Sequence, residues 1–168
     1  NLGYIPKGVL YEVATGKTLT ISGSFDAGMW QIFSCVGTGA VTLSGKIKEV
    51  YPEWWGLDGA ADDVAINKAS LAVATNGGVV KFQPITYVIN DTINLYSNVQ
   101  YIGSGFATII ASDNNFGDNR MMRNISYTAA DAASRDENII VENLAFDGSA
   151  NTTYTPTVPG VINAGGHA

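Results

Sequence analysis

The segment Val50-Tyr51-Pro52-Glu53-Trp54-Trp55-Gly56, followed shortly by Asp62-Asp63-Val64-Ala65-Ile66, decides how this chain folds. Two adjacent tryptophans behind a proline present a large apolar surface, which a folded protein normally covers. Asp62 and Asp63 stand just before apolar residues at helical spacing, where a side-chain oxygen can accept hydrogen bonds from free backbone N–H groups. The segment therefore predicts an extended stretch, a tight turn and the capped start of a helix.

The predicted helix covers residues 64–74. One of its faces carries small and apolar side chains, namely Ile66, Ala69, Ser70 and Val73. Asn76-Gly77-Gly78 supplies the left-handed stop that ends many helices. Since small residues suit close packing, we expect a short capping helix that joins two β regions and covers one of them.

Short apolar segments, each broken by Gly, Pro, Asn or Asp, predict strands on both sides of this helix. The predicted strands are residues 9–13, 19–23, 30–35, 41–45, 79–82, 86–89, 93–95, 99–102, 108–110, 121–123, 139–141 and 144–146. Residues 1–6 carry no clear pattern and are expected to form a tail. Polar insertions are predicted at 113–120, 127–137 and 151–159.

Two repeats indicate that these strands stack as coils. Leu19-Thr20-Ile21-Ser22-Gly23 is nearly copied by Val41-Thr42-Leu43-Ser44-Gly45, 22 residues later. A period of about 20 residues of strand and turn is typical of a β-solenoid coil. Asn98 and Asn138 lie 40 residues apart, about two such coils, and asparagines at matched turns can hydrogen-bond along the stack.

The amino-acid composition limits the kinds of partner that this chain is expected to bind. The chain has 168 residues, enough for one well-buried domain, with 46% hydrophobic and only 14% charged residues. Its net charge of -6 argues against nucleic acid, because no basic excess is present to neutralise phosphates. An anionic partner could still bind through local hydrogen bonds.

The chain has one cysteine and one histidine, which limits the metal sites and disulfides that it can form. Cys35 is the only cysteine, so no intrachain disulfide or thiolate metal site is expected. His167 is the only histidine, which excludes a His-based metal cluster. We predict no cofactor, no metal and no membrane insertion, since no apolar run reaches membrane-spanning length. The chain does not open on a signal peptide, so cytosolic synthesis followed by assembly fits as well as secretion.

The opening segment resembles a known motif. Tyr51-Pro52-Glu53-Trp54-Trp55-Gly56, then Asp62-Asp63 and Ala65-Ile66, is similar to the start of pectate-lyase-like right-handed β-helices, most of all those of bacteriophage tailspikes. Further segments follow in the family's order: Gly77-Gly78-Val79-Val80, Tyr87-Val88-Ile89, Gly103-Ser104-Gly105 and Asn143-Leu144-Ala145-Phe146-Asp147-Gly148. The resemblance covers about 51–148. The chain departs from the family pattern at two places. Leu57-Asp58-Gly59-Ala60-Ala61 stands where the family has a Gly-Asp-Gly turn, and Val64 stands where it has a threonine.

The resemblance implies an all-β fold, a right-handed single-stranded parallel β-helix with one short capping helix. It implies a homotrimer on a virion tail, acting outside the cell with other tail proteins, that binds and often degrades host surface polysaccharide. The division expected is a β-rich lead-in at 1–50 and the start of a β-helix at 51–168 whose C-terminal end is missing. Two alternatives stay open: a non-catalytic structural or attachment module, and a secreted or cell-surface bacterial polysaccharide lyase or hydrolase.

No catalytic position carries over from the family by motif, so candidates come from the residues themselves. Glycoside hydrolysis needs two carboxyls about 5–10 Å apart, and a lyase needs a base. The carboxylates on the coils are Asp113, Asp118, Asp136, Glu137, Glu142 and Asp147. Matched coils could bring Asp118 or Asp136 near Glu142, and these three are the candidate catalytic residues.

The opening motif itself is interpreted as structural. Trp54 and Trp55 are expected to pack in the core, with a sugar-stacking platform as the alternative. Asp62 and Asp63 are expected to cap the helix, with acid–base catalysis or calcium binding as the alternative.

Overall fold

Strands dominate the part of the chain that the computed structural model describes, namely residues 3–114, 116, 120–127 and 135–151. Within those residues the strands are accompanied by one α-helix, α1 (Asp62–Ala74), and by the 3-10 helices η1 (Pro52–Trp55) and η2 (Gly105–Ala107). Every strand pair among them is parallel. The predominantly β architecture with one helix is therefore as predicted.

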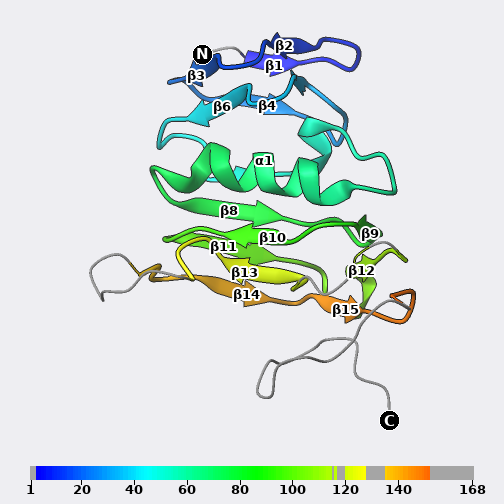
Figure 1. Cartoon of the computed structure of the whole chain (residues 1–168). Coiled ribbons are helices and arrows are strands. Elements are labelled where there is room, and N and C mark those ends of the chain that lie inside the picture. The colour runs from blue at the N-terminus through cyan, green and yellow to red at the C-terminus, as the bar shows by residue number, and fades with distance from the viewer. Residues whose placement is uncertain (1–2, 115, 117–119, 128–134, 152–168) are drawn as a thin grey trace.

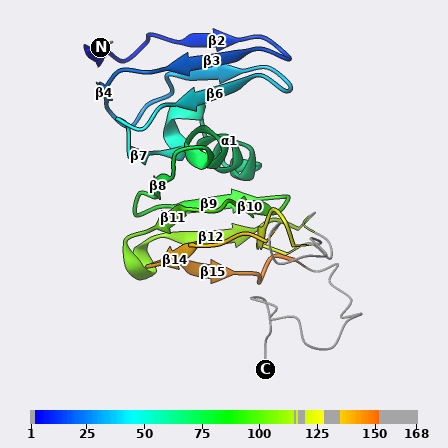
Figure 2. The ribbon, with the colours of Figure 1, turned by 90° about the vertical axis from the view of Figure 1, so that its left-hand side faces the viewer.

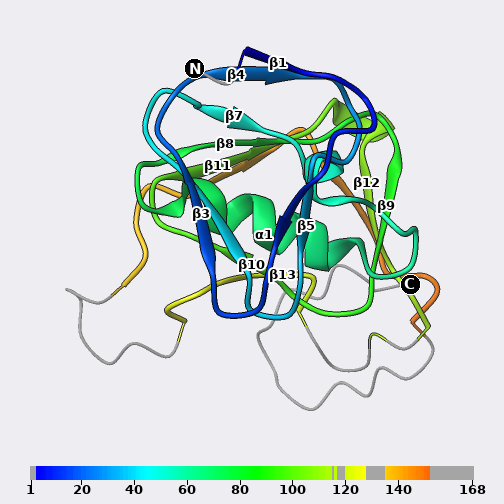
Figure 3. The same cartoon turned by 90° about the horizontal axis from the view of Figure 1, so that it is seen from above.

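The strands before the helix form three parallel pairs. They are β1 (Gly3–Ile5), β2 (Tyr11–Val13), β3 (Thr18–Ile21), β4 (Phe25–Ala27), β5 (Phe33–Cys35) and β6 (Ala40–Leu43), paired as β1-β4, β2-β5 and β3-β6. The pairing places Leu19 beside Val41 and Ile21 beside Leu43, which confirms that the two copies of the repeat are neighbours. In the view from above, these pairs run along different sides of the outline (Figure 3).

Three of the strands were missed from the sequence. Residues 1–6, predicted as a tail, contain β1, and neither β4 nor β7 (Glu49–Val50) was expected. Each has two or three residues and a single buried side chain, such as Ile5 in β1 or Val50 in β7. One inward side chain gives no alternation for a pattern to detect. The other predicted strands match observed ones to within three residues at each end.

After the helix the strands build longer sheets. They are β8 (Gly78–Lys81), β9 (Thr86–Ile89), β10 (Ile93–Leu95), β11 (Val99–Ile102), β12 (Ile109–Ser112), β13 (Met122–Asn124), β14 (Ile140–Glu142) and β15 (Ala145–Asp147). Their orders are β7-β8-β11-β14, β9-β12-β15 and β10-β13. Val50, Val80 and Tyr101 occupy matched positions of successive strands and are all fully buried. The core is thus a stack of apolar side chains that follows the strand layers.

Helix α1 lies between the two sets of strands. The earlier strands lie on one side of it and β8 to β15 on the other (Figures 1 and 2). Its buried residues include Ile66, Ala69 and Val73 from the predicted face. The expectation that it covers one β region is therefore too simple, because its small side chains let both sets approach it. The helix also begins at Asp62 rather than Val64.

The predicted asparagine contact is present, but at a different spacing. The side-chain amide of Asn138 donates to Oδ1 of Asn98, with 2.9 Å between nitrogen and oxygen. Strands β11 and β14 are direct neighbours, with Gln100 beside Ile140, so the two asparagines lie one layer apart and not two. The long connections between β11 and β14 explain the error, since they stretch this layer well beyond the 22-residue repeat.

Several predictions fall outside the described residues. The insertions at 113–120, 127–137 and 151–159 lie largely there, as do Asp118 and His167. Among the described residues, none of the helices combines the length and the hydrophobicity that crossing a bilayer would require.

Candidate functional site

The two tryptophans of the opening motif are part of the core. Trp54 and Trp55, in η1, are only 4% and 6% exposed. Their rings lie 5.1 Å from Phe25 and 5.0 Å from Phe33, centroid to centroid, and the indole N–H of Trp54 donates to the Gly28 carbonyl. These contacts join η1 to the strands before the helix. Rings buried to this extent offer no free face to a sugar.

The aspartate pair does not cap its own helix, contrary to the prediction. The N-cap position is Ala61, and no side chain accepts a hydrogen bond there. Instead, Oδ1 of Asp62 accepts from the backbone N–H groups of Asp58 and Gly59, and its Oδ2 accepts from that of Val88 in β9. The pair therefore reaches out of the helix to the preceding turn and to strands that follow.

Asp63 makes the same kind of link one residue further on. Its Oδ1 accepts from the backbone N–H of Asn90, 3.0 Å away, just after β9. Burial raises the pKa of the Asp63 carboxyl, and the backbone N–H bonds partly oppose that rise. The sequence could not show this role, because the partner lies 27 residues along the chain.

A third carboxyl, that of the partly buried Glu53, was missed entirely. Tyr87 Oη donates to Oε1 of Glu53 at 2.6 Å and accepts from the backbone N–H of Gln83 at 2.8 Å. Oε2 of Glu53 is buried without a hydrogen-bond partner. Burial raises the pKa of Glu53, the Tyr87 bond opposes the rise, and the nearby charge of Asp62 adds to it. This cluster links the opening motif to β9 and is shielded from solvent.

The candidate catalytic carboxylates are not brought together as a pair. Asp136 is held by serines: Ser97 Oγ donates to its Oδ1 at 3.1 Å and the Ser126 N–H to its Oδ2 at 2.6 Å. Glu142 is exposed at the far end of β14. Asp136 accepts from Ser97, just before β11, whereas Glu142 pairs with Ile102 at the other end of β11. At about 3.3 Å per residue this span is roughly 15 Å, beyond the range for glycoside hydrolysis. Asp118 lies outside the described residues.

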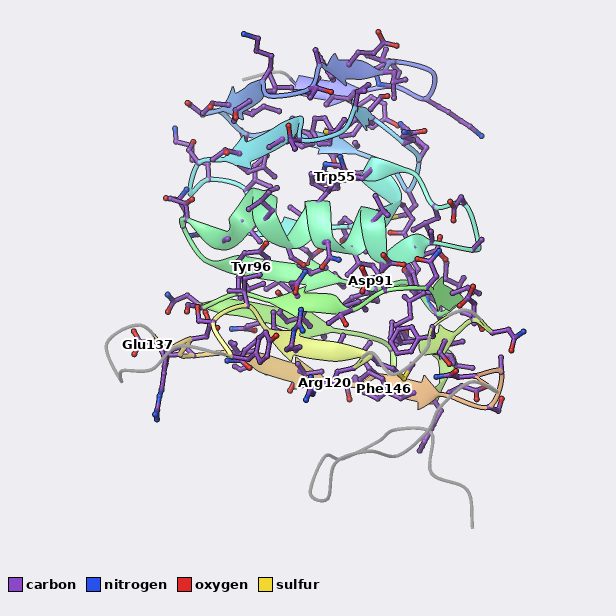
Figure 4. The ribbon with its side chains drawn as sticks, viewed as in Figure 1. Trp55, Asp91, Tyr96, Arg120, Glu137 and Phe146 are labelled. Atoms are coloured by element: carbon purple, nitrogen blue, oxygen red, sulfur yellow. The ribbon has the colours of Figure 1, made fainter. Side chains whose placement is uncertain are left out.

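One side of the molecule gathers cationic and aromatic groups. The chain's three arginines, Arg120, Arg123 and Arg135, all lie between 120 and 135. The guanidinium carbon of Arg123 lies 4.2 Å from the centroid of the Tyr127 ring, and that of Arg120 lies 6.0 Å from it. The strand pair β10-β13, which carries Arg123 opposite Asn94, faces the viewer in Figures 1 and 4. We call Asn94, Arg120, Arg123 and Tyr127 the Arg–Tyr cluster.

Two polar atoms of the Arg–Tyr cluster have no hydrogen-bond partner. They are Nε of Arg123, a donor, and Oδ1 of Asn94, an acceptor, and both are covered from solvent. The backbone N–H of Asn94 is used, since it donates to Oδ1 of Asn67 in α1 at 2.7 Å. All three arginines lie in one short stretch of the sequence. This pattern could have indicated the cluster, but the candidate residues were chosen as paired carboxylates.

No His, Cys, Asp and Glu residues cluster in a way that suits a metal ion within the described ranges. Comparison with known proteins adds no relative: no family model, curated protein or solved structure matches this chain.

Proposed function

We propose that this chain is the N-terminal part of a bacteriophage tailspike-like protein that binds host surface polysaccharide and, in its complete form, degrades it. In this proposal the strand layers are coils of a right-handed, single-stranded parallel β-helix. The complete protein is a homotrimer that acts outside the cell, joined to other proteins of the virion tail.

The stacking of the strands supports the β-helix part of the proposal. All strand pairs of the described residues are parallel and in register. Sets of three successive strands stack on one another both before and after α1, and the last described layer holds β14 and β15. Asn98 and Asn138, both with positive φ, repeat one turn geometry in neighbouring layers. Parallel strands joined in this way by short corners stack layer on layer, as in a solenoid.

The Arg–Tyr cluster is the observation that carries the binding function. Tyr127 is 50% exposed, and the guanidinium groups of Arg120 and Arg123 lie near its ring. The hydroxyl groups of a sugar need hydrogen-bond donors nearby, and guanidinium groups are rich in N–H donors. This combination, on one side of a stack of strands, suits an extended carbohydrate chain.

A structural or attachment module is the second candidate. The engagement of Asp136 by Ser97 and Ser126 favours it, because a carboxylate that accepts bonds from two serines orders a corner of the fold. In this case the chain would join tail components and leave polysaccharide intact.

The test is incubation of capsular and O-antigen polysaccharides with this 168-residue chain and, in parallel, with the full gene product. Size-exclusion chromatography follows polymer length, and co-elution follows binding. Binding by the chain, with shortening only by the full product, is the expected result. Shortening by the chain itself would move the chemistry into these residues and make Asp136 and Glu142 the first to substitute. Neither binding nor shortening by either protein would leave the structural module as the better account.

A further inference from the structure

The Arg–Tyr cluster is an electrostatic exception within this chain. The net charge is -6, yet every arginine lies between 120 and 135. Both Arg120 and Arg123 lie near the ring of Tyr127, so their guanidinium groups are on the order of 10 Å apart or closer. Two like charges at that distance repel one another, and an anion placed between them would relieve the repulsion.

The two arginines have no direct ion-pair partner in the described part of the chain. Among the described residues the salt bridge is between Lys81 and Glu49, and neither Arg120 nor Arg123 forms one. The side chain of Asp136 lies near Tyr127, because it accepts hydrogen bonds from the adjacent Ser126. Asp136 keeps its negative charge in these bonds, but no ion pair among the described residues joins it to Arg120 or Arg123.

The Nε edge of the Arg123 guanidinium is covered from solvent and has no hydrogen-bond partner. Stacking over Tyr127 uses the flat face of the guanidinium, whereas a carboxylate is bound through the N–H groups along its edge. A buried donor without a partner is energetically unfavourable. A turn of the side chain toward the surface would remove this cost and bring Nε to a ligand.

Asn94 supplies the complementary acceptor. It lies opposite Arg123 across the β10-β13 pair, and its Oδ1 is likewise without a partner. An arginine donor edge beside an amide oxygen matches a sugar acid, in which a carboxylate and a hydroxyl lie on the same ring. A neutral sugar would use the acceptor but leave the two cations without a counter-charge.

We propose that the Arg–Tyr cluster binds the carboxylate of an acidic sugar residue within the polysaccharide. Arg123 forms the two-point contact with the carboxylate, Arg120 adds a second positive charge, and Asn94 accepts from a hydroxyl of the same sugar. Tyr127 holds Arg123 by stacking. The inference rests on the proposed function, because it names the sugar class taken by that same site.

The experiment measures binding of the full 168-residue chain to a glycan panel of neutral, sulfated and carboxylated polymers. Each carboxylated polymer is paired with its carboxyl-reduced form, which differs only in that group. The expected result is binding of carboxylated polymers and loss of binding on reduction. Arg123→Gln should weaken binding about 10- to 100-fold, the range for a charge-assisted contact, and raised salt should weaken it in the unsubstituted chain.

Three variants make the comparison specific. Arg123→Lys keeps the positive charge but loses the planar pair of N–H donors that binds a carboxylate at two points. Its affinity should therefore lie between those of the original chain and Arg123→Gln. Lys17→Gln removes the same charge from an exposed residue in the earlier strand set and should leave affinity unchanged. Thermal unfolding checks that each variant is folded. If Arg123→Gln does not fold, Arg120→Gln and Arg123→Lys carry the test.

The other outcomes separate the inference from the function on which it rests. Equal binding of carboxylated and carboxyl-reduced polymers, unaffected by Arg123→Gln, would overturn the acidic-sugar inference and leave polysaccharide binding in place. Equal binding of sulfated polymers would show a general anion site and overturn the carboxylate preference. Absence of binding to any polymer would overturn the proposed function and the inference together.

Discussion

Glu53 is a carboxylic acid held beside a tyrosine at the contact between the opening motif and strand β9. Its Oε1 accepts from Tyr87 while its Oε2 has no partner, and burial raises its pKa above the ordinary value of 4.5. The folded chain therefore holds this proton more tightly than the unfolded chain does. The contribution of Glu53 to stability is greatest below pH 4.5 and falls as the pH rises through the folded-state pKa.

Glu53→Gln should therefore stabilise the chain at neutral pH. The amide can still accept from Tyr87 but carries no buried charge, so we expect a gain of about 1 kcal/mol near pH 7 that shrinks toward acidic pH. Urea unfolding at a series of pH values measures it. Glu12→Gln, at an exposed position, serves as the control and should show no such trend. A gain that is the same at every pH would contradict this account.

The side chain of Asp62, unlike that of Glu53, has partners for both oxygens and accepts three backbone N–H bonds. Asp62→Asn would turn an amide NH₂ toward one set of these donors, leaving N–H groups facing each other in a buried site. We expect a loss of about 2–4 kcal/mol in the free energy of unfolding. Asp26→Asn, which is exposed, is the matched control in the same denaturation experiment. A loss no larger than that of the control would show that the three bonds do not stabilise the fold.

At the scale of elements, one turn geometry recurs just before successive strands of the β8-β11-β14 sheet. Gly77, Asn98 and Asn138 precede β8, β11 and β14 at matched positions and have φ values of 67°, 62° and 55°. Only glycine and, to a lesser degree, asparagine adopt this left-handed region readily. The two asparagines add a side-chain hydrogen bond between layers.

Substitution of Asn98 should separate these two contributions. Asn98→Gly keeps the backbone geometry and loses the side-chain bond, so we expect a cost of about 0.5–1.5 kcal/mol. Asn98→Ala also forces a β-carbon without a polar group into the left-handed region, which adds about 1 kcal/mol. Thermal unfolding of both variants gives the difference. Equal stability of the glycine and alanine variants would show that the backbone geometry contributes nothing.

At the scale of the whole molecule, the apolar columns of the core become partly exposed at β14 and β15, the last described strands. Tyr101 is fully buried, but Val141, its partner in the next strand, is 39% exposed. In the next sheet Ile110 is fully buried, while its partner Phe146 is 38% exposed. Since each layer is covered by the next, the position of a residue along the stack decides how much its side chain contributes.

This gradient predicts different costs for similar substitutions in one column. Ile110→Ala should cost about 2–4 kcal/mol, because it leaves a cavity inside the stack. Phe146→Ser should cost less and should reduce the binding of a hydrophobic dye, because it removes exposed apolar surface. Chemical denaturation and dye fluorescence measure the two effects. A larger loss from Phe146→Ser than from Ile110→Ala would show that β15 is covered more fully than these exposures indicate.

The sequence by itself determined the local elements and their repeat. Apolar residues at helical spacing ended by Asn76-Gly77-Gly78 specify α1, and the near copy at 19–23 and 41–45 specifies two neighbouring strands. These features depend on residues close together in the chain, where spacing alone carries the information. The core position of Trp54 and Trp55 followed from their size and apolar character.

Only the tertiary structure decided which distant groups meet. Asp62 and Asp63 bind backbone that follows them by more than 25 residues, and Arg123 lies opposite Asn94 because β13 pairs with β10. Such contacts depend on how many residues each connection inserts between parallel strands, and sequence spacing does not reveal that. For the same reason Asn98 and Asn138 were placed about two layers apart when they are neighbours.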